Sequence, residues 1–264
     1  MWCSDPFLNY LKSFGYCIVL LPRTNVKPLQ VLSKQGGKLD QLGDLTTLLV
    51  AGDAIQLPPR SENIRVAQIS GQRTSDLGIG ISISILGNIL SAMGGSRLGI
   101  DSHYRQAKTA VFEFHDVLRD EIELLNLDQY LTNADINPFS HHAANLLVSD
   151  QLYVTTATIK SSKLTIEAKR SDGTSLELNI PEIQEIVGGN VKVSGQATTT
   201  SRIIYEGNTP LVFGFQAVQL FYNQGHYSRF ELIRSGNSMR EGPVSSNTTR
   251  QLESEGPFIR LNGE

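Results

Sequence analysis

Two cysteines are the side chains of this sequence best suited to covalent chemistry. Cys3 lies beside Trp2, two residues from the start of the chain, and a terminal thiol next to an apolar side chain is a candidate for acylation. Cys17 lies within the apolar run 16–21 and is expected to be a small buried side chain. Two cysteines make neither a disulfide framework nor a metal site. The sequence therefore offers one candidate modification site, Cys3.

Metal and catalytic sites are only weakly indicated. His141 and His142 are adjacent, but neighbouring residues do not share a helix face, and no acidic or cysteine partner is spaced to join them. No serine or cysteine lies in a known nucleophile signature. Gly94-Gly95-Ser96 lacks the lysine of a phosphate-binding loop. The sequence predicts no metal centre and no enzyme, and both remain as the weaker alternatives.

Composition places the chain among ordinary globular proteins. It has 264 residues, of which 19% are charged and 40% hydrophobic, with a formal net charge of -3; this length can bury one large core or two. There is no basic helix interleaved with aromatic residues, so nucleic-acid binding is not expected. No basic segment followed by a long apolar region opens the sequence, so we expect the protein to be made and kept in the cytoplasm.

The run from Leu77 to Leu86 has the strongest periodicity in the sequence. Isoleucine alternates with glycine or serine, and no ionisable side chain lies between Asp76 and Arg97. The isoleucines are Ile79, Ile81, Ile83 and Ile85. A period of two predicts a strand, and a tilted membrane strand needs only about ten residues with one apolar face. A half-buried strand of a cytosolic domain has the same pattern, so both interpretations stay open.

Other segments supply the expected scaffold. The spacing of apolar residues over 116–131 predicts a helix. Polar and apolar residues alternate over 153–169 with a break at Ser161-Ser162, which predicts a strand with an interruption. A short helix is expected over 181–187, ended by two glycines, and strands should resume over 191–205.

Six short segments near the start combine residue types and spacings in a distinctive way. They are Met1–Leu8, Tyr10–Lys12, Phe14–Tyr16, Leu20–Arg23, Val26–Leu32 and Leu42–Leu45. These segments resemble the bacterial gasdermins, and length and layout extend the resemblance over essentially the whole chain. Gasdermins are pore-forming proteins held inactive until a protease removes a C-terminal inhibitory part. The resemblance implies an α+β fold, with a gasdermin-N-like twisted central antiparallel β-sheet and surrounding helices, in a resting monomer.

The resemblance also implies that two hairpin regions lengthen on activation and refold into a large membrane β-barrel. The arms of the first would be 62–86 and 100–116, and those of the second 152–170 and 190–206. Glu113 and His115 could face only water or a pore lumen. The residues assigned to membrane strands are Ile79, Ile81, Ile83, Ile85, Leu164, Ile166, Val191 and Val193. Permanent strands of an α+β domain have the same periodicity.

The C-terminal region divides by composition. Residues 235–249 are rich in glycine and serine and nearly free of apolar side chains, which is typical of an exposed, cleavable linker. We expect a pore-forming domain over 1–234, a linker over 235–252 and, as the resemblance implies, an autoinhibitory peptide over 253–264. The candidate cut points are Arg240, Arg250 and Leu252, and the candidate inhibitory contacts are Phe258, Ile259 and Leu261. A disordered tail is the alternative.

The resemblance completes the expected function. It implies a covalent palmitoyl group on Cys3 and no other cofactor. The implied partners are a caspase-like or other dedicated protease and the lipids of the inner membrane, with a monomer at rest and a homo-oligomer when active. The expected protein is an autoinhibited pore-forming effector of bacterial antiphage defence that moves from the cytoplasm to the cell inner membrane and causes cell death. A soluble lipid carrier with an apolar cavity is the alternative.

Overall fold

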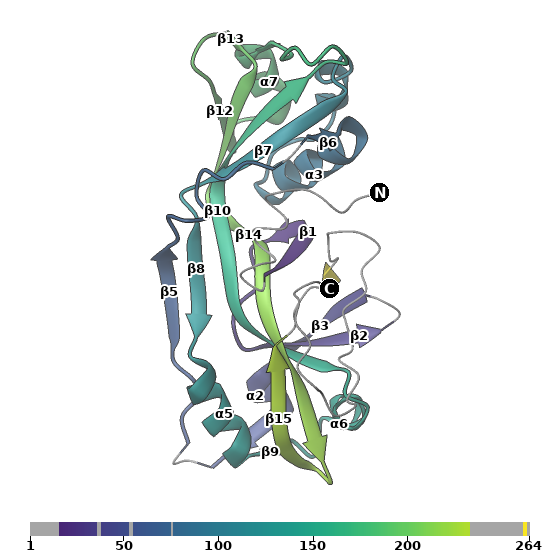
Figure 1. Ribbon diagram of the computed structural model, residues 1–264, viewed down its shortest axis with the longest axis vertical. Coiled ribbons are helices and arrows are strands. Elements are labelled where there is room, and N and C mark those ends of the chain that lie inside the picture. The colour runs from purple at the N-terminus through teal and green to yellow at the C-terminus, as the bar shows by residue number, and fades with distance from the viewer. Residues whose placement is uncertain (1–15, 36–37, 53–54, 75, 233–260, 263–264) are drawn as a thin grey trace, which may run out of the picture.

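The computed structural model describes residues 16–35, 38–52, 55–74, 76–232 and 261–262. Within them the chain forms an elongated α+β molecule built on a large antiparallel sheet (Figure 1). The predicted fold class is therefore confirmed. Cys3, the three candidate cut points, Phe258 and Ile259 lie outside the described residues.

Two long strands form the spine of the molecule. β10 (Leu152–Lys169) and β14 (Arg202–Asn223) pair antiparallel from Tyr153 opposite Gln219 to Glu167 opposite Arg202. The register shifts between Ser161 and Lys163, where the Ser161 hydroxyl accepts the Lys163 N–H at 3.0 Å. The break predicted at Ser161-Ser162 is thus confirmed as an irregularity in one continuous strand.

The remaining strands extend from this spine. The main path of the sheet runs β1 (Cys17–Arg23), β14, β10, β2 (Gln30–Gln35), β3 (Lys38–Asp44) and β16 (Leu261–Asn262). The strands off this path are β5 (Arg60–Arg65), β6 (Leu77–Gly78), β7 (Thr109–His115), β8 (Leu118–Ile122), β12 (Val191–Ser194) and β15 (His226–Leu232). β7 and β8 share one edge of β10, and β12 and β15 pair with β14.

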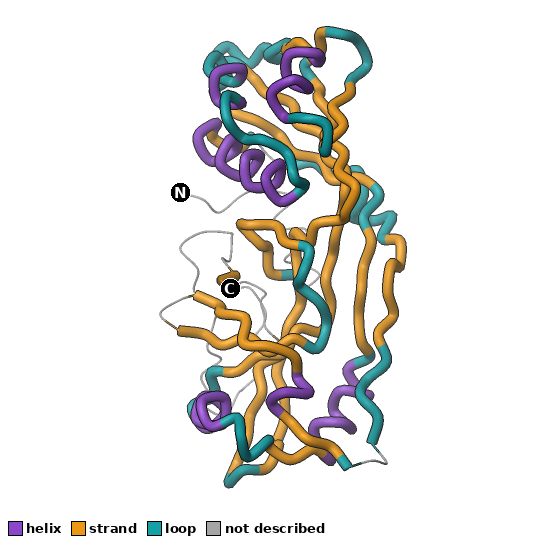
Figure 2. Tube along the Cα trace, turned by 180° about the vertical axis from the view of Figure 1, so that it is seen from behind, coloured by secondary structure: helices purple, strands orange, loops and turns teal. Residues whose placement is uncertain are grey.

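Short elements complete the two ends. They are the helices α2 (Leu45–Leu48), α3 (Ile79–Ala92), α4 (Ile100–His103), α5 (Leu124–Asn133), α6 (His141–Val148) and α7 (Ile180–Val187), and the strands β4 (Leu49–Ala51), β9 (Ala134–Ile136), β11 (Leu178–Asn179) and β13 (Thr199–Thr200). The helices gather at the two ends of the long axis (Figure 2). α3, α4 and α7 cover one end of the sheet, and α2, α5 and α6 the other.

α7 shows how local sequence sets an element. The Asn179 side chain accepts the Glu182 N–H at 3.4 Å, and Pro181 occupies the first turn, where its missing N–H costs no hydrogen bond. The helix ends at Gly188, whose φ of 88° suits glycine. The predicted helix over 181–187 and the strand at Val191 are confirmed.

The strand predicted for Leu77–Leu86 is wrong for this structure. Only Leu77 and Gly78 are extended, and α3 follows directly. Residues 79–93 carry a helical stripe as well, whose buried members are Ser82, Ile85, Leu86, Ile89, Leu90 and Met93. That stripe packs on the core formed with α7, β7, β10, β12 and β14. Two periodicities coexist in the run, and burial of this stripe selects the helix.

The helix predicted over 116–131 is also partly wrong. Its first part is strand β8, which pairs with β10 and β5, and only α5 is helical. Asp116 has a φ of 49° in the short link between β7 and β8, and the two strands keep one register along β10, with His115 opposite Lys163 and Leu118 opposite Lys160. Leu125, one of the apolar residues in the predicted helix, is 77% exposed. Long-range pairing outweighs the local helical spacing here.

Candidate functional site

Four neighbouring strands, β7, β10, β14 and β12, form a sheet with two chemically different faces. Their register places four apolar residues in one row: Phe114, Leu164, Tyr205 and Val193. The next apolar row contains Phe112, Ile166 and Ile203. This face packs against α3 and α7 in a buried core. Four of the residues predicted for membrane strands therefore share this sheet: Leu164, Ile166, Val191 and Val193.

The opposite face of the same sheet carries the charged residues, because successive side chains of a strand point to opposite sides. One row contains His115, Lys163, Glu206 and Lys192, and the neighbouring positions add Glu113, Glu167 and Arg202. The prediction that Glu113 lies away from the apolar face is confirmed, since it alternates with the buried Phe112.

Glu113 is the centre of an ion-pair network on this charged face. Its carboxylate lies 2.7 Å from the Arg202 guanidinium, 3.9 Å from Nε of Arg73 and 3.6 Å from Nε2 of His115. Arg73 also pairs with Glu167. The two carboxylates are only 13% and 16% exposed, whereas both arginines are nearly half exposed. The network joins β7, β10 and β14 to the segment that leads into β6.

A second, more buried ion pair marks the point where β10 changes partner from β7 to β8. Lys160 Nζ lies 2.5 Å from the Asp120 carboxylate, whose other oxygen accepts the Asn63 N–H at 2.8 Å. The two side chains are 16% and 9% exposed. Removing one member would leave a buried charge without its partner, which typically costs about 3–5 kcal/mol.

Two buried phenols lie beneath the helices. The hydroxyls of Tyr104 and Tyr205 are 3.0 Å apart and join the C-terminal end of α4 to β14. Burial raises the pKa of Tyr104, opposed by its hydrogen bond to Tyr205. Burial also raises the pKa of Tyr205 well above its usual value, with further contributions from Tyr104. Both phenols therefore stay neutral near physiological pH.

The C-terminal strand lies on the edge of the main sheet. β16 pairs in parallel with β3, with Leu261 opposite Leu39 and Asn262 opposite Asp40, beside β3 in Figure 1. Because β3 is otherwise the last strand of the path, β16 covers part of its exposed edge. Unpaired strand edges are templates for pairing with another chain.

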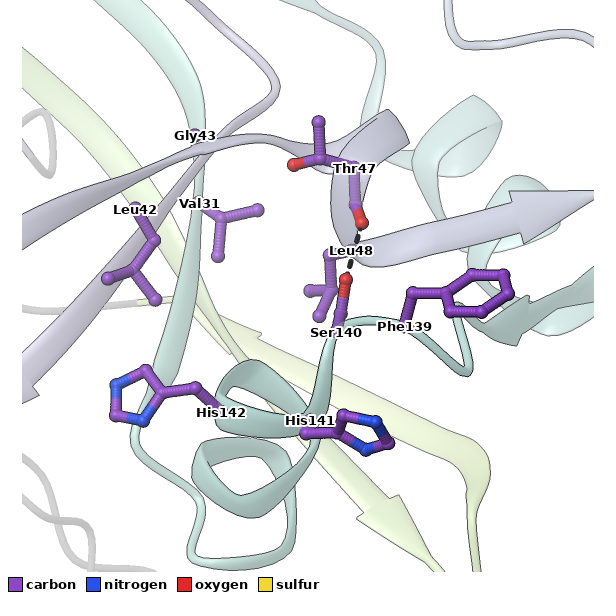
Figure 3. Close-up of a pocket in the computed structure, with 9 residues that line it drawn as sticks. All are labelled: Val31, Leu42, Gly43, Thr47, Leu48, Phe139, Ser140, His141 and His142. Carbon is purple, nitrogen blue, oxygen red and sulfur yellow. Dashed lines mark hydrogen bonds between the residues drawn. The ribbon is translucent and has the colours of Figure 1, made fainter.

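The histidine pair borders a surface hollow at the end of the molecule where α2 and α6 lie (Figure 3). The hollow has a volume of about 260 Å³ and is lined by Val31, Leu42, Gly43, Thr47, Leu48, Phe139, Ser140, His141 and His142. The two imidazoles point away from each other in Figure 3. Over the described ranges, no three histidine, cysteine or acidic side chains gather as a metal site. Ligand pockets are usually about 300 to 1,000 Å³, and this hollow is smaller than that range.

Comparison with known proteins assigns the chain to a family. The model described as Bacterial Gasdermin Family matches residues 19–226. A gasdermin from a Desulfuromonadales bacterium is 58% identical over 265 residues and covers 100% of both chains. A second, from Lysobacter enzymogenes, is 40% identical over 240 residues, 90% of this chain and 89% of that relative. This chain belongs to the bacterial gasdermin family.

The fold agrees with that assignment. The structure of a bacterial gasdermin from Bradyrhizobium tropiciagri matches with a TM-score of 0.64, over 98% of this chain and 96% of that one. Because the identity is 14%, this likeness concerns the fold alone. Among the described residues of this gasdermin, no helix has the length and hydropathy needed to cross a membrane.

Sequence reasoning about this gasdermin missed the ion pairs. Glu113 meets Arg202, 89 positions away, and Lys160 meets Asp120, 40 positions away. Alternation within each strand indicated which side chains point away from the apolar face. Which of them meet depends on strand order and register, and no local signal carries that information.

Proposed function

We propose that this gasdermin is an autoinhibited pore-forming effector of bacterial antiphage defence. Membership of the family supports a pore-forming effector rather than an enzyme. The observation that carries the proposal is the two-faced sheet of β7, β10, β14 and β12, with apolar and charged residues on opposite sides. A membrane β-barrel needs the same division, with apolar residues towards lipid and polar residues towards the lumen.

On activation, different groups would contact the apolar face of the sheet. At rest α3 and α7 pack on it; in the pore, lipid would replace these helices. An isolated hairpin leaves backbone groups unpaired in lipid, whereas a closed ring of hairpins from many subunits leaves none. The active form is therefore a homo-oligomer that forms a large β-barrel in the cell inner membrane, and the resting form is a cytoplasmic monomer.

The proposed switch is the C-terminal peptide over 253–264. Its strand β16 lies against β3, and a caspase-like or other dedicated protease would cut the linker over 235–252, at Arg240, Arg250 or Leu252. Burial of Phe258, Ile259 and Leu261 would contribute about 1.5–3 kcal/mol for each fully buried side chain. While tethered, the peptide rebinds at high effective concentration, and once cut it can dissociate.

The proposed lipid modification is a palmitoyl group on Cys3. Each buried CH₂ contributes about 0.8 kcal/mol, yet one acyl chain anchors a protein only marginally to a membrane. Many chains on one oligomer would bind membranes strongly through multivalency. An intact mass equal to that of the bare polypeptide would argue against this modification.

Dye release from liposomes tests the proposed function. An engineered protease site is placed near Pro243, and the protein is mixed with dye-loaded vesicles of phosphatidylethanolamine and phosphatidylglycerol. The control protein carries a scrambled site that the protease does not cut. We expect leakage only from the cleavable protein after protease is added. Complete cleavage on a gel without leakage would overturn the pore-forming function and favour the carrier alternative.

A further inference from the structure

The ionisable residues on the charged face of the sheet of β7, β10, β14 and β12 lie in rows that run across the strands. Residues directly opposite one another on neighbouring antiparallel strands have Cβ atoms about 4.5–5.5 Å apart. One row contains Lys163 of β10, Glu206 of β14 and Lys192 of β12, with His115 of β7 beside Lys163. We call the three residues Lys163, Glu206 and Lys192 the lysine row.

The neighbouring rows on this face are neutral because their charges are paired. Two glutamates and two arginines form the ion-pair network described above. They are Glu113, Glu167, Arg73 and Arg202. Further along the same face, Lys169 Nζ lies 2.8 Å from the Asp76 carboxylate. Each positive charge of these rows is therefore balanced by a negative charge.

The lysine row differs from its neighbours because it carries an excess positive charge. Two lysines flank one glutamate, so the net charge of the row is +1 while His115 is neutral. Within the part of the chain that the structure describes, neither lysine has a carboxylate within 4.0 Å of its ammonium group. Lys192 is exposed, and Lys163 and Glu206 are half-buried. The net charge of this face therefore comes from the lysine row.

The side chains of the lysine row point away from the apolar core. Lys163 precedes Leu164, which is 1% exposed, and Lys192 precedes Val193, which is 7% exposed. Successive side chains of a strand point to opposite faces of its sheet. When the apolar face contacts lipid, as in the function proposed above, the lysine row therefore faces the water-filled lumen.

A closed ring of identical subunits repeats each row around the lumen. The paired rows become rings in which positive and negative charges alternate, so their fields largely cancel. The lysine row becomes a ring with more positive than negative charge, and rings of lysine or arginine favour anions in channels. The effect reaches about one Debye length from the wall, which is about 10 Å at 0.1 M salt and about 30 Å at 0.01 M. It is therefore strongest in dilute salt.

We propose that the lysine row makes the pore of this gasdermin pass small anions more readily than small cations. Lys163 and Lys192 create the preference, and Glu206 opposes it. The inference rests on the pore-forming function proposed above and adds the class of solute that the lumen favours.

The reversal potential of the pore in a planar bilayer tests this preference. The cleavable full-length protein is cut on bilayers of phosphatidylethanolamine and phosphatidylglycerol, with about 0.01 M KCl on one side and about 0.1 M on the other. We expect a permeability ratio of chloride to potassium above one. The ratio should fall towards one when the two concentrations are raised to about 0.1 and 1 M, because the Debye length drops to about 3 Å on the concentrated side. A ratio at or below one in dilute KCl would overturn the inference.

Neutral substitutions assign the preference to the lysine row. The double variant Lys163→Gln with Lys192→Gln should lower the permeability ratio in dilute KCl to one or below, and Glu206→Gln should raise it above that of the parent. The two variants change the ratio in opposite directions, so either one suffices if the other does not fold. Urea unfolding of the uncut protein identifies a variant that has lost its resting fold. An unchanged ratio in a folded variant would contradict the assignment.

Lys27→Gln is the matched control. Lys27 is exposed in the link between β1 and β2, outside the four strands, so its loss removes a positive charge and should leave the ratio unchanged. An equally large shift in this control would show that the preference does not arise at the lysine row.

Two further outcomes separate this inference from the function on which it rests. If the double lysine variant forms pores more slowly but keeps the parent ratio, its lysines contact lipid phosphates rather than the lumen, and the inference fails. Conductance without anion preference likewise overturns the inference alone. Absence of any conductance from completely cut parent protein would overturn the pore-forming function and the inference together.

Discussion

Replacing Gly87 in α3 by alanine should stabilise the resting state and slow pore formation. Gly87 lies in the interior of the helix, where glycine is less favourable than alanine by about 0.5–1 kcal/mol. An added Cβ would meet Arg97 Cβ at 3.4 Å and Arg97 Cδ at 3.7 Å, which is ordinary contact with a long side chain. The Gly87→Ala chain should therefore gain about 0.5–1 kcal/mol in its free energy of unfolding.

The kinetic consequence follows if α3 must unfold before the membrane hairpin forms. A barrier higher by about 0.5–1 kcal/mol slows a rate by about 2- to 5-fold, because each 1.36 kcal/mol is tenfold. The assay is the rate of dye release after complete cleavage, together with urea unfolding of the uncut protein. Gly80→Ala, with no atom within 4 Å of the added Cβ, should act in the same direction but more weakly because it lies in the first turn.

A matched control separates this effect from general stabilisation. Gly52 lies outside any helix, and a Cβ added there would have no atom within 4 Å, so Gly52→Ala should leave the leakage rate unchanged. If Gly87→Ala raises the free energy of unfolding and leakage keeps its original rate, α3 does not unfold before or during the rate-limiting step. That result would refute the reasoning.

Three further outcomes are expected from the ion pairs and phenols. Lys160→Met should lower the free energy of unfolding in urea by about 3–5 kcal/mol, because it leaves the Asp120 charge buried and unpaired; a loss below about 1 kcal/mol would show that water reaches the carboxylate. Glu113→Gln should lower the free energy of unfolding by only about 1 kcal/mol, because both arginine partners are half exposed. Adding 1 M salt should reduce the difference in stability between this variant and the parent. The raised pKa values of Tyr104 and Tyr205 make the free energy of unfolding depend on pH. Their contribution is fully present below the unfolded tyrosine pKa of about 10 and is lost as the pH rises towards the pKa values of the folded protein. The slope is up to about 1.4 kcal/mol per pH unit for each phenol. The double variant Tyr104→Phe with Tyr205→Phe should flatten that slope in unfolding experiments between pH 9 and 12, and an unchanged slope would contradict the assignment.

Much of this gasdermin could be predicted from its sequence. The alternation over 153–169 predicted β10 and its break, since strand periodicity is a local property that burial on one face preserves. The proline and glycines around 181–188 predicted both ends of α7. Proline restricts the backbone angle φ and glycine widens its allowed range, wherever these residues occur. The motifs near the start of the chain indicated the family, which the comparisons then confirmed.

Tertiary structure decided what local patterns leave undetermined. The run 77–92 contains both a strand period and a helical stripe, and the helix prevails because the core beneath α3 accepts the stripe of Leu86 and Leu90. Residues 118–122 became a strand because β10 and β5 offered hydrogen-bonding edges on either side. Glu113 pairs with Arg202 because the register of β7, β10 and β14 brings them together. Each of these outcomes depends on which distant segments meet, and that is a property of the folded chain rather than of any window of its sequence.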